Sequence, residues 1–268
     1  MLEVGRKGVG HVAQIDLNAD LGEGYGPWRM GDDAAMMQIV TSANVACGGH
    51  AGDAETMAAT LLIAKENGVS VGAHPGFTDR QGFGRRVIPM TPAEIGRMCA
   101  AQIGALRGVA TQVDVAVSYV KPHGALANLA ARDRTVADAI CQAVARMDRA
   151  LGILAISGTQ TEVAARDAGL PVYSEIFADR GYLSSGQLVP RGEEGAMIHD
   201  ADEAATRIVQ FLQSGLMPVV DGDPIPLAAH SICVHGDSPG AVQMARNIRD
   251  RLTSEGVVLR SFMQVPAR

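Results

Sequence analysis

The sequence lacks the features that mark membrane, exported and nucleic-acid-binding proteins. No apolar run reaches the roughly 18 residues that a membrane helix requires. The first residues, MLEVGRKGVGHVAQ, contain no apolar signal core, so we expect a cytoplasmic protein. Aromatic residues make up only 4% of the chain and the net charge is -6, which argues against a nucleic-acid surface.

Motifs of nucleotide and nucleophile chemistry are also missing. The chain has no G-x-x-x-x-G-K-[ST] loop for nucleotide phosphates and no G-x-S-x-G elbow for a serine nucleophile. Gly22, Gly24 and Gly26 do not have the G-x-G-x-x-G spacing of a dinucleotide-binding fold. The four cysteines show no C-x-x-C spacing and lie in apolar stretches, which is typical of buried, reduced thiols.

The sequence does contain a regular alternation of predicted strands and helices. Apolar runs that end in polar residues recur as IDLNAD, SANVACGGH, VSVGAH, VSYVKPHG, VYSEIFADRG and ICVHGD. In a chain of 268 residues, seven or eight strand–helix units favour a closed parallel barrel over an open doubly wound sheet. We therefore predict α/β architecture with one β/α-barrel domain at residues 13–268, after a polar lead-in at residues 1–12.

Capping signals and apolar spacing place individual elements. Asp53 and Thr91 each predict a helix start, the second as a capping box with Glu94. The alanine-rich stretch Leu126–Ala150 predicts one long helix, and Leu216–Leu227 predicts a short hairpin. Val257–Phe262 predicts a final strand.

Acidic and histidine side chains gather where the predicted strands end, which is where β/α folds carry their chemistry. Asp16, Asn18 and Asp20 alternate along the first strand and so share one face, and Glu23 follows that strand. The histidines that follow other strands are His50, His74, His123 and His235. Carboxylates and imidazoles that converge at a barrel mouth are typical ligands of a catalytic divalent metal. The alternative is that they are ordinary rim residues that hydrogen-bond to loops.

Charged residues farther along the chain have two interpretations each. Lys121, at the end of a buried strand, either pairs with a neighbouring acid or polarises a carbonyl or binds an anionic substrate. Glu175 and Asp179 resemble an acid pair fit for base or ligand work, and the alternative is a salt bridge to Arg180 or Arg191.

The segment Gly76–Met90 predicts a long loop, because it holds three glycines and three arginines. Arg85 and Arg86 are placed to recognise a carboxylate or phosphate, although solvated loop charges are an alternative. The glycines make the loop a candidate lid.

Long motifs in this order resemble one family. IDLNADLGEGYGPW, SANVACGGHAGD, GAHPGFTDRQGFGRR, VKPHGAL and ADRGYLSSGQLVPRG together look like the LamB/YcsF family, which comprises the A subunits of 5-oxoprolinase. The resemblance implies a seven-stranded parallel β/α barrel, TIM-like and of the glycoside hydrolase/deacetylase type. It also implies ATP-dependent opening of the lactam of 5-oxo-L-proline to L-glutamate, together with partner subunits B and C.

We expect roles for particular residues at the positions carried over from the family and, for Arg85 and His235, at positions outside that set. The expected catalytic residues are Asp20, His50, His74, Lys121, His123 and Glu175. The expected substrate-binding residues are Asn18, Glu23, Arg85, Asp179, Arg180 and His235. A divalent metal, if one binds, is expected on Asp16, Asp20, His50 and His74. The sequence departs from the family at Gly49 and Ala127, where an aromatic residue is usual, which predicts a wider or differently lined pocket.

ATP is expected either on this chain or on the partner subunits, because the chain has no P-loop. The sequence leaves the oligomeric state open, and a homo-oligomer is compatible with it. Two other functions remain as alternatives: a stand-alone metal-dependent deacetylase or amidohydrolase, and a non-catalytic ligand-binding subunit. Hydrolysis of an amide by the isolated chain would favour the first, and ligand binding without loss of turnover in rim variants would favour the second.

Overall fold

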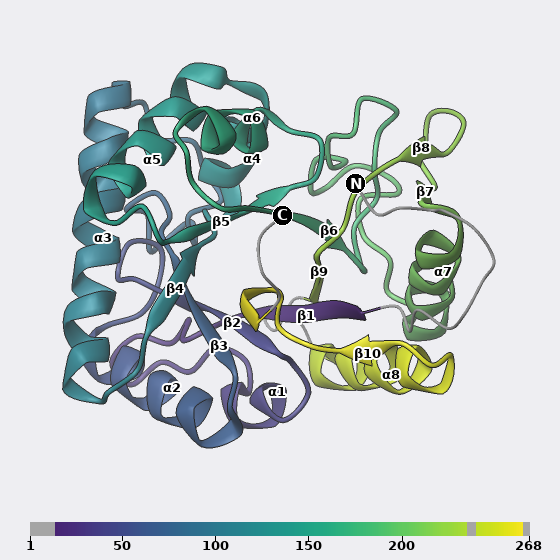
Figure 1. Cartoon of the computed structure of the whole chain (residues 1–268), viewed down its shortest axis with the longest axis horizontal. Coiled ribbons are helices and arrows are strands. Elements are labelled where there is room, and N and C mark those ends of the chain that lie inside the picture. Colours follow the sequence, from purple (N-terminus) through teal and green to yellow (C-terminus); the bar gives the residue numbers. More distant parts are fainter. Residues whose placement is uncertain (1–13, 235–239, 265–268) are drawn as a thin grey trace.

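Seven parallel strands close into a barrel in this computed structural model, which describes residues 14–234 and 240–264 (Figure 1). Around the barrel the strands are β1 (Gln14–Leu21), β2 (Ser42–Ala46), β3 (Ser70–His74), β4 (Val117–Val120), β5 (Gly152–Ile156), β6 (Val172–Phe177) and β9 (Ser231–Val234). The barrel is closed because β9 pairs in parallel with both β6 and β1. The predicted seven-stranded parallel β/α barrel is therefore confirmed.

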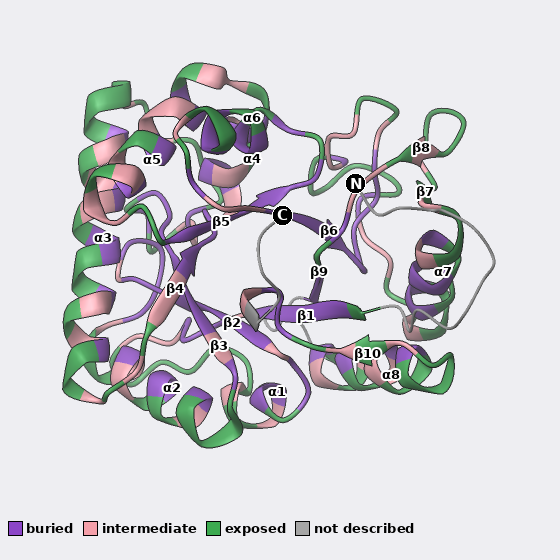
Figure 2. Ribbon diagram, viewed as in Figure 1, coloured by how far each residue is buried: buried purple, intermediate pink, exposed green. Residues whose placement is uncertain are grey.

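Helices surround the barrel, and most of their outer faces are exposed while the strands are buried (Figure 2). They are α1 (Asp33–Met37), α2 (Ala54–Asn67), α3 (Pro92–Gln112), α4 (Gly124–Arg132), α5 (Arg134–Met147), α6 (Gln160–Asp167), α7 (Ala201–Ser214) and α8 (Ala241–Ser254). None of the helices in the described ranges is both long and apolar enough to cross a bilayer.

Several local predictions hold. Asp53 caps α2 through Thr56 N, and Thr91 forms the predicted capping box with Glu94 at the start of α3. β7 (Leu216–Met217) and β8 (Ile225–Pro226) form the predicted antiparallel hairpin. All four cysteines are buried and free.

Two element predictions are wrong. The long helix predicted at Leu126–Ala150 is broken into α4 and α5 at Asp133, whose side chain accepts hydrogen bonds from Thr135 N and Val136 N and so starts a new helix. The strand predicted at Val257–Phe262 shrinks to β10 (Val258–Leu259), which pairs with β1, and a short 3-10 turn, η1 (Phe262–Gln264), follows. The predicted lead-in at residues 1–12 lies outside the described residues.

The barrel interior is unusually polar along β1. Leu17 and Ala19 belong to the apolar core, whereas Asp16, Asn18 and Asp20 bond to side chains of other barrel strands. Alternation along the strand therefore sends the apolar residues outward to the helices and the polar ones inward. This inward row of polar side chains leads up to the mouth of the barrel.

Candidate functional site

A pocket of about 600 Å³ opens at the carboxyl ends of the strands. Its inner wall includes Asp20 at the end of β1, His74 at the end of β3, and Lys121 just after β4. The loop 183–191 and the start of α4 form other parts of its wall. A cavity of this size at the mouth of a barrel is typical of a small-molecule site.

Lys121 is buried in the inner part of the pocket between two carboxylates. Its Nζ lies 2.8 Å from Glu175 Oε1 and 3.0 Å from Asp20 Oδ1. Burial by itself would lower the pKa of this ammonium, but the charges of Asp20 and Glu175 raise it well above its ordinary value. Burial also raises the pKa of Glu175, and Lys121 opposes that rise. Glu175 therefore pairs with Lys121, in place of the arginine partner that the sequence left open.

Beside Lys121 and its two carboxylates, His74 and His123 face each other, and each ring has a proton on the nitrogen that points away from the other ring. His74 Nδ1 lies 2.7 Å from the carbonyl oxygen of Lys121, and His123 Nε2 lies 2.8 Å from that of Phe83. A carbonyl oxygen only accepts, so each histidine carries its proton on that nitrogen. The opposite nitrogens, His74 Nε2 and His123 Nδ1, are 2.9 Å apart, and His74 Nε2 is also 3.3 Å from Asp20 Oδ2. Two imidazole nitrogens at this distance are joined either by a proton between them or by a cation beside them.

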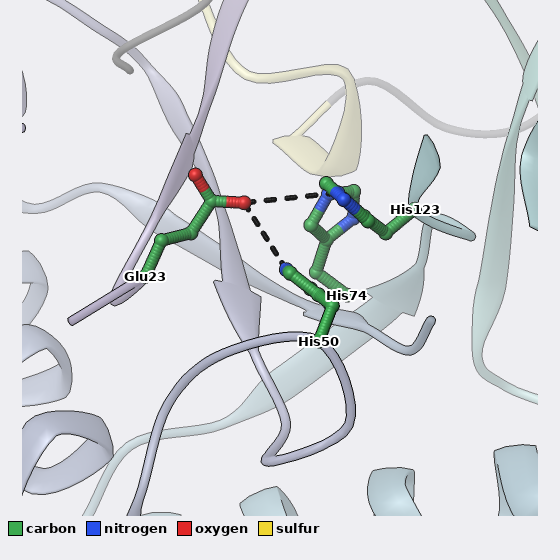
Figure 3. A group of neighbouring side chains, drawn as sticks. All are labelled: Glu23, His50, His74 and His123. Atoms are coloured by element: carbon green, nitrogen blue, oxygen red, sulfur yellow. Dashed lines mark hydrogen bonds and ion pairs between the residues drawn. The ribbon is translucent and has the colours of Figure 1, made fainter. Parts of the chain in front are cut away.

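A third imidazole and a carboxylate lie at the same point. His50 Nε2 lies 3.1 Å from Glu23 Oε1, which is 3.7 Å from His123 Nδ1 (Figure 3). The rings of His50 and His123 stack with centroids 3.6 Å apart. Burial and the neighbouring histidines lower the pKa of His50 well below its ordinary value and that of His123 to about 3. Both rings are therefore neutral near pH 7, as metal ligands must be.

This arrangement could hold a metal ion, and its members are Glu23, His50, His74 and His123. One ligand atom from each lies within 4.8 Å of the others. The backbone carbonyls behind His74 and His123 supply the kind of support that orients metal-binding imidazoles. His50 Nδ1 is buried and has no hydrogen-bond partner among the described residues, so structural hydrogen bonding there does not account for the ring. The donor set therefore fits a divalent cation of the zinc type.

The structure brings only two of the four predicted metal ligands, His50 and His74, into this group. Asp16 lies away from the histidines, because its carboxylate accepts hydrogen bonds from the hydroxyls of Thr41, Ser42 and Ser231 within the barrel. Asp20 is near the cluster, 3.3 Å from His74 Nε2, but its other oxygen is bound to Lys121. Glu23, expected to bind substrate, and His123 join His50 and His74 instead.

Asn18, expected to bind substrate, lies beneath the described pocket lining. Its side chain is fully buried below the pocket, and Asn18 is not among the pocket-lining residues of the described ranges. It bonds instead to Lys121, Glu175 and other inward side chains. His235 lies outside the described residues.

Arginines supply positive charge to the pocket wall. Arg85, Arg180 and Arg191 all line it, and Arg180 is buried, with Nε and Nη2 donating to the carbonyls of Ala196 and Val189. Burial lowers the pKa of Arg180 to about 10, and the charge of Arg191 adds to this decrease. The charge of Asp179 opposes the decrease. A cluster of like charges around a cavity is suited to an anionic ligand. Arg86, in contrast, pairs with Asp79 within its own loop.

The loop 76–90 packs directly against the histidines. A side chain at Gly76 would come within 2.8 Å of His50 Nδ1, and one at Gly84 within 2.7 Å of His50 Cβ, so both positions require glycine. Gln102 of α3 holds the loop by accepting from Gly76 N at 3.0 Å and donating to Gly76 O at 2.7 Å. The loop therefore forms a wall of the site, and its action as a lid stays a prediction.

The two departures from the family pattern differ in their effect. A side chain at Gly49 would overlap Gln102, whose amide fills that space, and Gly49 is not part of the pocket lining. Ala127, in contrast, lines the pocket. Sequence reasoning missed Gln102 because it lies mid-helix without a motif. It also missed Asn44, although the register that pairs Asn44 with Asp20 places both at one level of the barrel.

Comparison with known proteins gives one consistent result. A model described as the LamB/YcsF family matches residues 15–267. The A subunit of 5-oxoprolinase from Gluconobacter oxydans is 52% identical over 248 residues, which cover 92% of this chain and 98% of that relative. Its counterpart from Paracidovorax citrulli is 53% identical over 248 residues, or 92% and 99% of the two chains. The lactam utilization protein from Thermus thermophilus superposes with a TM-score of 0.88 at 42% identity, covering 92% of this chain and 99% of that one.

Proposed function

Because the chain belongs to the LamB/YcsF family, we propose that it is the hydrolytic subunit of an ATP-dependent 5-oxoprolinase. Its reaction is the opening of the lactam of 5-oxo-L-proline to L-glutamate. The names of relatives about half identical over nearly their whole length support this assignment. The observation that carries it is the buried Lys121 between Asp20 and Glu175 beside His74 and His123, all of which line one pocket.

The reaction requires water to add to the lactam carbonyl carbon and the ring C–N bond to break, with a proton passing to the departing nitrogen. An unstrained five-membered lactam resists this, so transfer of the terminal phosphoryl group of ATP to the lactam oxygen, with release of ADP, would make the carbon more electrophilic. The phosphate would then leave with that oxygen's bond to phosphorus cleaved or as the leaving group of the tetrahedral intermediate, so that the products are glutamate, ADP and phosphate. Lys121 is suited to stabilise that oxygen through its positive charge, because an ammonium stabilises developing negative charge. Asp20, which lies between Lys121 and His74, is suited to accept the proton of the water.

The substrate's own carboxylate needs a cationic partner. Arg85 and Arg180 in the pocket wall are the proposed partners. The charge of Asp179 favours the charged form of Arg180. Glu23, His50, His74 and His123 would hold a divalent metal, which would supply Lewis-acid polarisation of a carbonyl or a water of lowered pKa. Glu23 replaces Asp16 in this set because the Asp16 carboxylate is bound by hydroxyls inside the barrel.

ATP is proposed to bind mainly to partner subunits, because the chain carries no P-loop. The word "subunit" in the relatives' names supports a complex, and the B and C subunits are the proposed partners. We place this complex in the cytoplasm, where its reduced cysteines are stable.

The test is glutamate release from 5-oxoproline with ATP, measured with this chain alone and with purified B and C subunits. We expect turnover only in the mixture, and none when Lys121→Met replaces the native chain. Lys65→Met is the matched control, because Lys65 is an exposed lysine far along α2 and should leave turnover intact. Full turnover with Lys121→Met would overturn the assignment.

The histidine cluster favours one second candidate, a metal-dependent amidohydrolase that needs neither ATP nor partners. Zinc-dependent hydrolysis of 5-oxoproline or an N-acetyl amide by the isolated chain, without ATP, would establish that function instead.

A further inference from the structure

Asn18 occupies a position in which every hydrogen-bonding group of its side chain is used. Its Nδ2 lies 3.0 Å from Glu175 Oε1 and 2.6 Å from Ser231 Oγ. Its Oδ1 lies 3.2 Å from Lys121 Nζ and 2.7 Å from Asn44 Nδ2. A carboxamide has two donor hydrogens and two acceptor lone pairs, so none is left for a substrate.

The charges of its neighbours fix which way the Asn18 carboxamide points. The Glu175 carboxylate only accepts, so it must face the Nδ2 end, and the Lys121 ammonium only donates, so it must face the Oδ1 end. Turning the group over would set donor against donor and acceptor against acceptor. Asn18 therefore bridges the two charges of the ion pair and sets their separation.

Ser231 fixes Asn18 from below. Its hydroxyl has a single hydrogen, which it donates to the Asp16 carboxylate, so the oxygen is left to accept from Asn18 Nδ2. Asp16 is held in turn by the hydroxyls of Thr41 and Ser42, each 2.6 Å from Oδ1.

Tyr119 fixes Asn18 from the side, through Asn44. Asn44 Nδ2 also bonds to Asp20 Oδ1 at 2.8 Å, which leaves Asn44 Oδ1 to accept from the Tyr119 hydroxyl at 2.7 Å. Tyr119 reaches across β3 to Asn44 because the residue between them in register is Gly72. A Cβ there would lie 2.2 Å from the Tyr119 ring.

We propose that Asn18 is a positioning residue that holds Lys121 and Glu175 in one working geometry, and that Tyr119 and Ser231 act on the site through it. Tyr119 is not among the described residues that line the pocket, yet its hydroxyl donates to Asn44 Oδ1 and so helps to hold Asn44, which in turn donates to Asn18. The effect on turnover rests on the proposed lactam-opening function. The effect on the signal and proton exchange of Lys121 does not depend on that function.

The test uses the scarcity of lysine in this chain. Lys7, Lys65 and Lys121 are the three lysines of the sequence, so ¹⁵N-lysine labelling of the full chain gives three side-chain signals. Lys7→Arg and Lys65→Arg variants each remove one of the other two lysine signals and so identify the signal of Lys121. The buried ammonium of Lys121 should exchange its protons slowly with water, since its hydrogens are held by acceptors.

The decisive comparison is Tyr119→Phe against Tyr173→Phe. Tyr173 and Tyr119 belong to the same small buried cluster, and Tyr173 packs over Gly152 as Tyr119 packs over Gly72. Within the described residues, however, no hydrogen bond joins the Tyr173 hydroxyl to Asn44. We expect Tyr119→Phe to shift the Lys121 signal and speed its proton exchange severalfold, and Tyr173→Phe to change neither. Ser231→Ala removes a different partner of Asn18, so it should also shift the Lys121 signal and speed its proton exchange. It provides the test if Tyr119→Phe does not fold.

Turnover by the complete complex gives the second readout. A displaced Lys121–Glu175 pair should lower kcat by about tenfold to a hundredfold in Tyr119→Phe with little change in KM, because small misplacements act on the transition state. An unchanged Lys121 signal in folded Tyr119→Phe and Ser231→Ala proteins would overturn the positioning role. Absence of lactam turnover in the native complex would instead refute the proposed function, and the lysine signals would still decide the role of Asn18.

Discussion

Replacing Asp16 by asparagine should alter how the stability of this protein depends on pH. Asp16 is fully buried in the barrel, and its side-chain partners among the described residues are the hydroxyls of Thr41, Ser42 and Ser231, none of them basic. Burial raises the pKa of its carboxyl group to about 6, although these three hydroxyls oppose the rise. Asp16→Asn keeps the shape of the side chain and removes the titration.

The effect of Asp16 on the free energy of unfolding depends on pH, because protonation of its carboxyl group is linked to folding. The ordinary pKa of the group is 3.8, so between pH 3.8 and about 6 the folded protein binds a proton that the unfolded chain has lost. The stabilisation from this group is therefore complete below the ordinary pKa and is lost as the pH rises through about 6. At about 1.4 kcal/mol per pKa unit, the free energy of unfolding loses about 3 kcal/mol over this range because of Asp16.

Urea-induced unfolding at several pH values between 4 and 7 would measure this loss. The wild-type protein should lose about 3 kcal/mol relative to Asp16→Asn as the pH rises, because the variant has no carboxyl group to ionise there. Asp202→Asn, at an exposed position in the first turn of α7, is the matched control and should follow the wild type. Parallel stability curves for wild type and Asp16→Asn would refute the raised pKa and the reasoning based on burial.

Other perturbations test the site itself. Lys121→Met should lower the free energy of unfolding by about 3–5 kcal/mol in urea titrations, because it leaves the buried carboxylates of Asp20 and Glu175 without their cation; an unchanged midpoint would contradict the buried ion pair. Glu23→Gln should reduce the amount of zinc that each chain retains after dialysis, as measured by elemental analysis. Native protein that retains no divalent metal would argue against the cluster as a metal site. Gln102→Ala should cost about 1–3 kcal/mol and speed amide hydrogen exchange in the loop 76–90, because Gly76 loses both partners; unchanged exchange there would show that other contacts hold the loop.

The sequence by itself determined the class of fold and the level of the barrel at which chemistry is located. Apolar runs that end in polar residues mark strands, and a proline or glycine after them marks where each strand stops. Thr91 with Glu94 and Asp53 carry their capping signals within a few residues, so the helix starts were readable. The break at Asp133 was missed, because the alanine-rich sequence on either side favours helix and hides the capping side chain of Asp133 between the two helices.

Only the tertiary structure decided which polar residues meet. Alternation along β1 places Asp16, Asn18 and Asp20 on the same inward face, but it does not say how high each lies in a closed barrel. The register between strands does: it pairs Asp16 with Ser231, low in the barrel, and Asp20 with Asn44, nearer the mouth. Residues separated by two positions therefore differ by a full layer of side chains, because each strand rises about 3.3 Å per residue. A hydroxyl layer surrounds the lower carboxylate, and an ammonium and an imidazole meet the upper one.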